Sequence, residues 1–155
     1  MAGDVEAQLA VLDITLPDAP APAANYVPYV RTGNQVFISG QVPWIGGERN
    51  FVGKVGTDFS VEEGQAAART VALNIIAQVK AACDGDLDRV VRCVKLGGFV
   101  NCPSDFHDHP KVINGASDLM VAVFGDVGRH ARFAVGAPAL PFNVAVEIDA
   151  VFEVR

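Results

Sequence analysis

The sequence predicts an α+β domain of two layers, with two helices on one face of a mixed, mainly antiparallel sheet. Three features predict this fold: two stretches with apolar residues at helical spacing, several short β-branched stretches, and a clear alternation near the C-terminus. The expected order is strand, strand, helix, strand, helix, strand, strand. Two helices cover only one face of such a sheet, so the other face must meet water or another subunit.

The first strands are expected as a β-hairpin over residues 29–42. Residues 32–34, Thr-Gly-Asn, supply the turn chemistry, and Val36, Phe37 and Ile38 are typical strand residues. The stretch 52–55, after the turn at Gly46 and Gly47, suggests a further short strand.

The first helix is expected over residues 60–82, where Ser60 and Glu63 form the pattern of a capping box. Its apolar residues recur at helical spacing: Ala68, Val71, Ala72, Ile75, Ile76 and Val79. The second helix is expected over residues 110–124, closed by Gly125 and Gly128. Its apolar residues are Val112, Ile113, Ala116, Leu119, Met120 and Val123.

The remaining strands are expected over residues 87–100, 131–137 and 144–154. The last of these alternates most clearly, which predicts one face in the core and one face outside it. Val146, Ile148, Ala150, Phe152 and Val154 share one side, whereas Glu147, Asp149 and Glu153 share the other.

Length and composition indicate a single domain over residues 1–155, with residues 1–22 as an N-terminal lead-in. Half of the residues are hydrophobic, which is enough to bury a core. The net charge of −6 provides no basic stripe for phosphate backbones, so nucleic acid is disfavoured as a partner.

Cysteine usage and the N-terminus favour a cytoplasmic protein. The sequence has three cysteines, Cys83, Cys93 and Cys102, and no CxxC pair. Because an odd number without such a pair does not suggest a disulfide framework, a reducing compartment is expected. Cys83 and Cys93 are expected to pack in the interior, and Cys102 is expected to be the most exposed thiol. Residues 1–10 lack the basic start of a signal peptide, and no apolar run reaches membrane-spanning length.

Arg132 is the strongest candidate for a functional residue. It begins an expected strand, and its guanidinium forms a fork that matches a carboxylate. One interpretation is a clamp for a substrate carboxylate. The other is a structural ion pair with Glu147 or Asp149, which pattern alone favours because ion pairs are common.

Two further groups contain residue types that can perform chemistry. Glu147 can orient a water or carry a proton, but it shares its strand face with two other acids, and spacing does not set it apart. The His107-Asp108-His109 stretch contains possible metal ligands, yet neighbours in an extended loop splay apart and no second pair completes a site. No metal is therefore expected.

Several stretches in order resemble the Rid family of reactive intermediate deaminases, also called YjgF-like or endoribonuclease L-PSP-like proteins. Residues 27–30 read VPYV, similar to a GPYV-type entry, and residues 37–43 read FISGQVP, similar to an (I/V)SGQ(I/V)P strand. Asn114 falls where the family has a VN pair in its second helix. The strongest likeness is RFAV at 132–135, LP at 140–141 and VEIDA at 146–150, similar to RxxVxxxxLPxxxxxEIEA.

The resemblance implies a YjgF-like, chorismate-mutase-like fold assembled as a homotrimer, with ligand clefts between subunits and no cofactor. It implies that Arg132 binds the carboxylate of a 2-imino or 2-enamino acid and that Glu147 helps to place the water that hydrolyses it. The other residues implied to line the cleft are Tyr29, Ser39, Gly40 and Asn114. The products are a 2-keto acid and ammonia.

Departures from the family pattern point to a divergent branch and keep other functions open. A family cysteine is Ala134 here, and the connections 44–56 and 101–110 are longer, which reshapes the cleft and raises the question of whether they gate it. The alternative is a non-catalytic module that binds a keto acid or another small carboxylate. A ribonuclease ranks third, because the chain is acidic.

Overall fold

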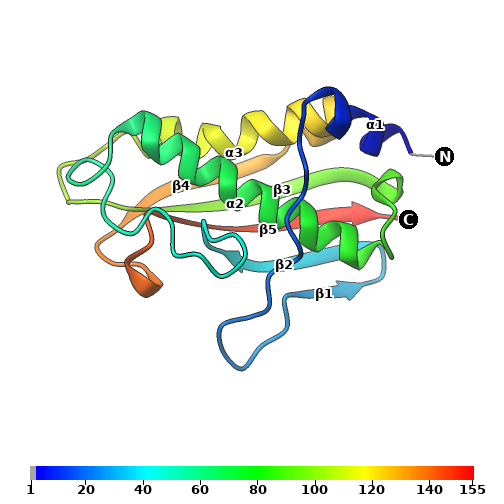
Figure 1. The fold of residues 1–155 in the computed structure, drawn as a ribbon, viewed down its shortest axis with the longest axis horizontal. Coiled ribbons are helices and arrows are strands. Elements are labelled where there is room, and N and C mark those ends of the chain that lie inside the picture. The colour runs from blue at the N-terminus through cyan, green and yellow to red at the C-terminus, as the bar shows by residue number, and fades with distance from the viewer. Residues whose placement is uncertain (1–2) are drawn as a thin grey trace.

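The chain forms one five-stranded sheet with the order β1-β2-β5-β3-β4 (Figure 1). The computed structural model describes residues 3–155. The strands are β1 (Tyr29–Thr32), β2 (Gln35–Gln41), β3 (Val90–Asn101), β4 (Ala131–Ala137) and β5 (Val146–Val154). Of the four pairs among these strands, β3–β4 is parallel and the other three are antiparallel. The expected mixed, mainly antiparallel sheet is therefore confirmed.

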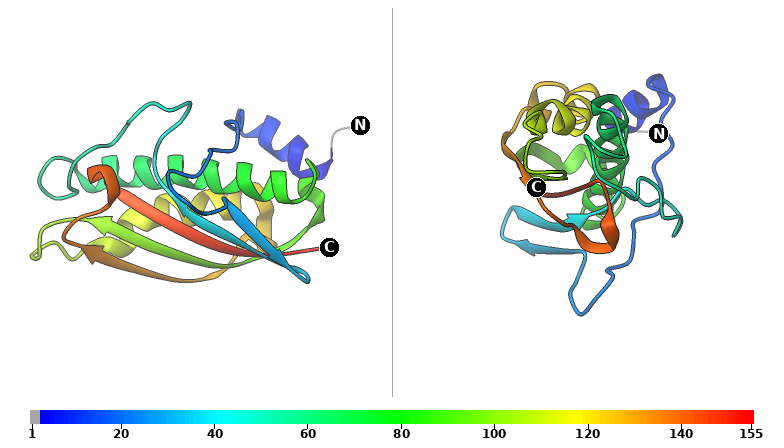
Figure 2. Two further views of the ribbon diagram at one scale, coloured as in Figure 1. Left: turned by 90° about the horizontal axis from the view of Figure 1, so that it is seen from below. Right: turned by 90° about the vertical axis from the view of Figure 1, so that its left-hand side faces the viewer.

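Two long helices, α2 (Val61–Ala82) and α3 (His109–Phe124), run side by side over one face of the sheet (Figure 2). Within residues 3–155 no helix covers the opposite face. Short 3₁₀ turns occupy Leu87–Arg89, Gly125–Gly128 and Pro141–Asn143. The predicted bounds of both long helices agree with the structure to within one residue.

Local sequence explains where α2 begins and ends. The Ser60 hydroxyl accepts from the Glu63 amide and the Glu63 carboxylate accepts from the Ser60 amide, each at 3.1 Å, so the capping box is complete. At the other end, Asp84 and Gly85 adopt positive φ angles of 55° and 89°. The Gly85 amide then donates to the Lys80 carbonyl and closes the last turn.

Strand β5 lies in the middle of the sheet and provides the core with its alternating residues. Val146, Ile148, Ala150, Phe152 and Val154 are all buried beneath the helices. Glu147, Asp149 and Glu153 point to the uncovered face, which we call the open face of the sheet. The alternation read from the sequence is confirmed.

A third helix, α1 (Asp4–Val11), lies in the N-terminal lead-in, where no helix was predicted from the sequence. The Asp88 carboxylate accepts from the amides of Asp4 and Val5, at 2.9 and 3.0 Å, and so caps this helix from a distant part of the chain. Glu6 pairs with Lys80 at 2.6 Å, and Leu9 is buried. Long-range contacts therefore stabilise a helix too short to form alone.

The connection 44–56 is fastened to the rest of the protein and contains no strand, so the strand expected at 52–55 is wrong. Val52 and Val55 make only isolated bridges. The buried Asn101 side chain donates to the Gly53 carbonyl at 3.5 Å and accepts from the Lys54 ammonium at 2.7 Å, and the Val55 amide donates to the Asn101 carbonyl. Hydrogen bonds to Asn101 therefore pair backbone groups of this connection that a strand would pair with a neighbouring strand.

All three cysteines are free and buried. Packing was expected for Cys83 and Cys93, but the expectation that Cys102 is exposed is wrong, because only 5% of it is accessible. Burial raises the pKa of each thiol, that of Cys93 to about 12. No helix within residues 3–155 is long and apolar enough to cross a membrane.

Gly115 sets the distance between α3 and α2. A Cβ atom built on Gly115 would overlap the backbone carbonyl of Gln65, which belongs to α2 and cannot move alone. The absence of a side chain thus brings α3 close to α2 and positions the residues that α3 directs toward β4.

We expect Gly115→Ala to destabilise the fold by about 1–3 kcal/mol, the usual cost of overpacking. Helix propensity alone predicts the opposite sign, a gain of about 1 kcal/mol. Urea unfolding of the variant beside wild type measures the difference, with exposed Asp118→Ala on the same helix as control. A midpoint equal to or above that of wild type would contradict the close helix contact.

Candidate functional site

Arg132 lies on β4, an edge strand, and points toward the helices. Its register partner on β3 is Leu96, which is fully buried beneath the helix layer, and paired residues point to the same face. The guanidinium reaches three acceptors. Nη1 donates to the Asn114 Oδ1 atom at 2.9 Å and to the Ser117 Oγ atom at 3.1 Å, and Nη2 donates to the Pro110 carbonyl at 3.0 Å.

All three acceptors of Arg132 are uncharged. The ion pairs found within residues 3–155 are Glu6–Lys80, Asp84–Arg89, Asp108–Lys111 and Asp126–Arg129. The interpretation of Arg132 as half of an ion pair with Glu147 or Asp149 is therefore wrong. Both acids sit on the open face, across the sheet from the guanidinium.

Two donors of the guanidinium remain for a ligand. Arginine has five N–H groups, and the three hydrogen bonds described above use both on Nη1 and one on Nη2. One N–H on Nε and one on Nη2 are left, on two different nitrogens bonded to the same carbon. A carboxylate has two oxygens to fill two such donors. The half-buried guanidinium thus has the charge and the donors to bind a carboxylate.

The sequence of α3 places the acceptors of Arg132 on one side of the helix. Asn114 and Ser117 are three residues apart, so they lie on neighbouring turns of the same face. Pro110 is in the first turn of α3, and its carbonyl is reached by the Arg132 side chain, which extends along the helix. The expected grouping of Asn114 with Arg132 is observed, whereas Ser117 was missed although the same spacing pointed to it.

Glu147 lies on the open face at the start of β5, opposite Phe99 on β3. Its carboxylate packs over Gly40 of β2, where a Cβ atom would come within 2.5 Å of Oε1. The register of β2 is irregular between Ile38 and Gln41, which brings this glycine to the carboxylate. Gly40 and Glu147 therefore form a second group, on the opposite face from Arg132 and Asn114.

Burial raises the pKa of Glu147 above its ordinary value of 4.5, and the neighbouring Asp149 raises it further. Both causes disfavour the charged carboxylate. A half-buried carboxyl of this kind exchanges a proton closer to neutral pH than an exposed one does, which suits acid–base work.

Tyr29 and Ser39 are both engaged within the chain. Tyr29 packs against the core, and the Ser39 hydroxyl donates to the Val27 carbonyl at 2.7 Å. The Ser39 amide also donates to the Pro28 carbonyl. Ser39 thus holds the entry segment against β2.

The neighbourhood of β4 contains a further polar pair that the sequence did not reveal. The Cys102 thiol and the His109 Nε2 atom are 3.4 Å apart, and both lie over Gly136, whose missing side chain leaves them room. Within residues 3–155 no three side chains of His, Cys, Asp or Glu are grouped to hold a metal ion.

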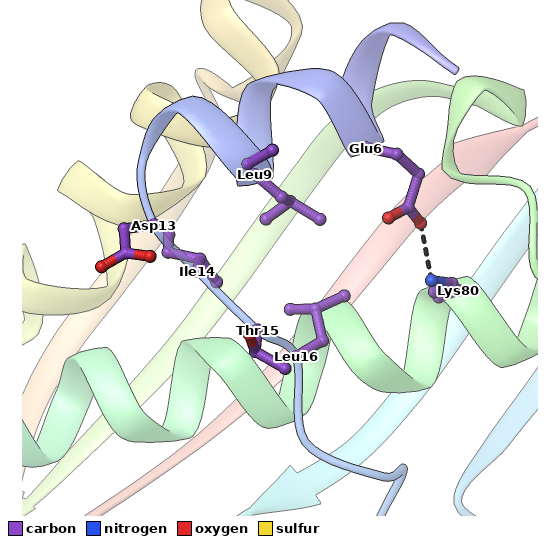
Figure 3. Close-up of a pocket in the computed structure, with 8 residues that line it drawn as sticks. Glu6, Leu9, Asp13, Ile14, Thr15, Leu16 and Lys80 are labelled. Atoms are coloured by element: carbon purple, nitrogen blue, oxygen red, sulfur yellow. Dashed lines mark ion pairs between the residues drawn. The ribbon is translucent and has the colours of Figure 1, made fainter. Parts of the chain in front are cut away.

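Two hollows of the surface are formed by other residues. A depression of about 480 Å³ sits beside α1, next to the Glu6–Lys80 ion pair and bordered by Leu9, Ile14 and Leu16 (Figure 3). A smaller one, of about 360 Å³, lies over α2 and α3 near Arg69. Neither is lined by a predicted site residue.

The raised pKa of Glu147 predicts a pH-dependent effect on stability. The folded chain binds this proton more tightly than the unfolded chain does. The resulting contribution of Glu147 to folding stability is fully present below the ordinary carboxyl pKa and is lost as pH rises through the raised pKa. We therefore expect Glu147→Gln to gain stability relative to wild type as pH rises through this window.

Urea midpoints of both proteins, measured from acid to neutral pH, test this expectation. Asp118→Asn, which removes an exposed carboxylate on α3, is the control for the loss of one charge. A constant difference between Glu147→Gln and wild type across the range would show that burial does not perturb this carboxyl.

Comparisons with known proteins agree with the fold and with the family resemblance. The family model described as "YjgF/chorismate mutase-like, putative endoribonuclease" matches residues 6–153. Protein TCP17 of Trypanosoma cruzi is 53% identical over 156 residues, which cover 99% of this chain and 96% of that protein. The crystal structure of Atu1372 from Agrobacterium tumefaciens superimposes with a TM-score of 0.91 at 48% identity, covering 97% of this chain and 92% of that one.

A more distant relative is named as an enzyme. The 2-iminobutanoate/2-iminopropanoate deaminase of Dermatophagoides farinae is 27% identical over 138 residues, which cover 89% of this chain and 92% of that protein. The lower identity to this enzyme than to TCP17 fits a divergent branch of a common family. Since the family model spans nearly the whole chain and the relatives align along its length, the chain belongs to the YjgF/chorismate mutase-like family.

Proposed function

We propose that this protein is a hydrolytic deaminase of 2-imino and 2-enamino acids, which binds the substrate carboxylate with Arg132. The observation that carries the proposal is the state of the guanidinium, which has neutral acceptors only and two N–H donors free on different nitrogens. The name of the Dermatophagoides farinae relative supports the choice of reaction.

The chemistry requires positioning and proton transfer more than a strong nucleophile. Water adds to C2 of the imine, the nitrogen takes up a proton, and the C–N bond breaks to release ammonia and leave a 2-keto acid. An enamine substrate first takes a proton on carbon to become the imine. Arg132 holds the carboxylate next to the reacting carbon, and the Glu147 carboxyl, with its raised pKa, is suited to orient the water and move its proton.

Arg132 and Glu147 lie on opposite faces of the sheet, so one copy of the chain cannot bring them together. A site that uses both must combine the Arg132 face of one copy with the open face of another. Such a contact joins two different surfaces, and head-to-tail contacts of this kind form a ring when the rotation between copies closes. The resemblance to the Rid family implies three copies, so the proposed assembly is a homotrimer with one site at each junction.

Apolar side chains on the open face support the same assembly. Large hydrophobic residues remain accessible there at 37–52% of their surface: Val30, Phe37, Phe99, Phe133 and Val135. Register pairs Phe99 with both Val135 and Glu147, so part of this apolar surface lies beside the proposed proton carrier. Phe37 pairs with Val30 and with Val151, farther along β5. Exposed apolar side chains on one face of a sheet are typical of a protein interface.

We expect Arg132→Ala to lose hydrolysis of 2-imino acids by about 100-fold or more, because a charged group with two hydrogen bonds to the substrate is removed. Arg132→Lys restores only part of it, since an ammonium lacks the fork. Ammonia release from imines generated in situ by an amino-acid oxidase provides the measurement. Arg129→Ala, which removes an exposed arginine three residues away, is the matched control.

Binding of a stable 2-keto acid, measured by calorimetry, distinguishes a deaminase from a module that binds carboxylates without turnover. Binding that depends on Arg132 without any turnover would replace the deaminase by a carboxylate-binding module, for which Ala134 at the family cysteine position is the motivating change. Equal turnover in wild type and Arg132→Ala would exclude the carboxylate clamp.

Light scattering is expected to give about three times the chain mass of 16.3 kDa. Phe37→Asp, which places a charge on the open face, is expected to shift the protein toward single chains. Val127→Asp is the control, because Val127 is similarly accessible but lies in the turn after α3. A wild-type protein of single-chain mass would overturn the proposed junction site.

A further inference from the structure

A chain of hydrogen bonds continues from Arg132 through Ser117 to His130 and ends on the backbone. The Ser117 Oγ atom is 3.1 Å from the Arg132 Nη1 atom and 2.8 Å from the His130 Nε2 atom. The other ring nitrogen of His130, Nδ1, is 2.6 Å from the Gly128 carbonyl. Three elements meet here, namely α3, the turn Gly125–Gly128 and the start of β4.

The direction of each bond in this chain follows from the carbonyl at its end. A carbonyl oxygen only accepts, so Nδ1 of His130 must carry the ring proton and donate it to Gly128. In the neutral ring Nε2 is then an acceptor, and the Ser117 hydroxyl donates to it. Once its hydrogen points at His130, the Ser117 oxygen turns its lone pairs to Arg132.

From this geometry we infer that Ser117 and His130 are positioning residues for Arg132. Together with Asn114 they engage both N–H groups of Nη1, so the guanidinium plane is held on one side and its Nε and Nη2 donors are left for the ligand. Without His130 the Ser117 hydroxyl is free to rotate and to direct its hydrogen at Arg132, which would repel the guanidinium. His130 acts through Ser117 and does not contact the proposed ligand side.

This inference rests on the proposed function for its kinetic readout, because holding Arg132 matters to catalysis only if Arg132 binds substrate. A carboxylate clamp that loses its orientation weakens binding while the chemical step is less affected. Loss of Ser117 or His130 should thus appear in KM and in keto-acid affinity more than in kcat. If Ser117 and His130 had a merely structural role, their loss would lower stability but leave KM and keto-acid affinity of the folded protein unchanged.

The kinetic test compares Ser117→Ala, His130→Ala and His130→Gln with wild type. The first two are expected to raise KM for a 2-imino acid about tenfold, the size of one hydrogen bond to a charged group, with kcat within about threefold. His130→Gln keeps an acceptor for Ser117 and is expected to restore most of the affinity. His107→Ala, which removes an exposed imidazole from the neighbouring loop, is the matched control.

Nitrogen NMR of the wild-type protein tests the same inference without any substrate. The His130 ring is expected as the Nδ1–H tautomer, and the Arg132 guanidinium is expected to rotate more slowly in wild type than in Ser117→Ala. An Nε2–H tautomer, equal rotation in both proteins, or an unchanged KM in His130→Ala would overturn the positioning role. The expected tautomer and slow rotation in a protein that neither binds keto acids nor hydrolyses imines would support the role of His130 and reject the proposed function.

Discussion

The helices of this protein cover one face of a five-stranded sheet and leave the other face open, and the arrangement of the site depends on this asymmetry. The apolar sides of the long helices α2 and α3 pack against the inward-facing residues of β5 and β3. On the open face, carboxylates and large apolar side chains share the surface. Burying that apolar area against another copy stabilises an assembly, whereas leaving it in water does not.

The two candidate groups are divided by the sheet itself. A pleated strand sends successive residues to opposite faces, so Arg132 on β4 joins the helix side and Glu147 on β5 joins the open side. A single chain therefore cannot place a carboxylate clamp and a proton carrier around one small molecule. In the proposed function, association of copies brings both groups to one junction and buries the apolar side chains of the open face.

A guanidinium held only by neutral acceptors differs from an ordinary surface arginine. Desolvating a charge without a counter-ion is unfavourable, and three hydrogen bonds offset only part of that cost. An anionic ligand can supply the remaining stabilisation. Ser117 and His130 make the arrangement directional, because the Gly128 carbonyl sets the tautomer of His130 and thereby the orientation of the Ser117 hydroxyl.

The sequence by itself determined the elements whose signals are local. The capping box at Ser60, the helical spacing of α2 and α3 and the alternation of β5 depend on neighbours a few residues apart, and each was read correctly. The Asn114–Arg132 pair followed only from the family resemblance. Pattern alone had favoured an ion pair for Arg132, since it could not show on which face of the sheet each charge lies.

Only the tertiary structure decided the features that join residues far apart in the chain. Helix α1 needs Asp88 as its cap, the 44–56 connection needs Asn101, and Cys102 is buried by residues outside its own loop. His130 has no sequence signal at all, because its role arises from the contact of a turn with α3. Local propensity acts within one or two turns of chain, whereas capping at a distance, burial and hydrogen-bond direction exist only once the layers have packed.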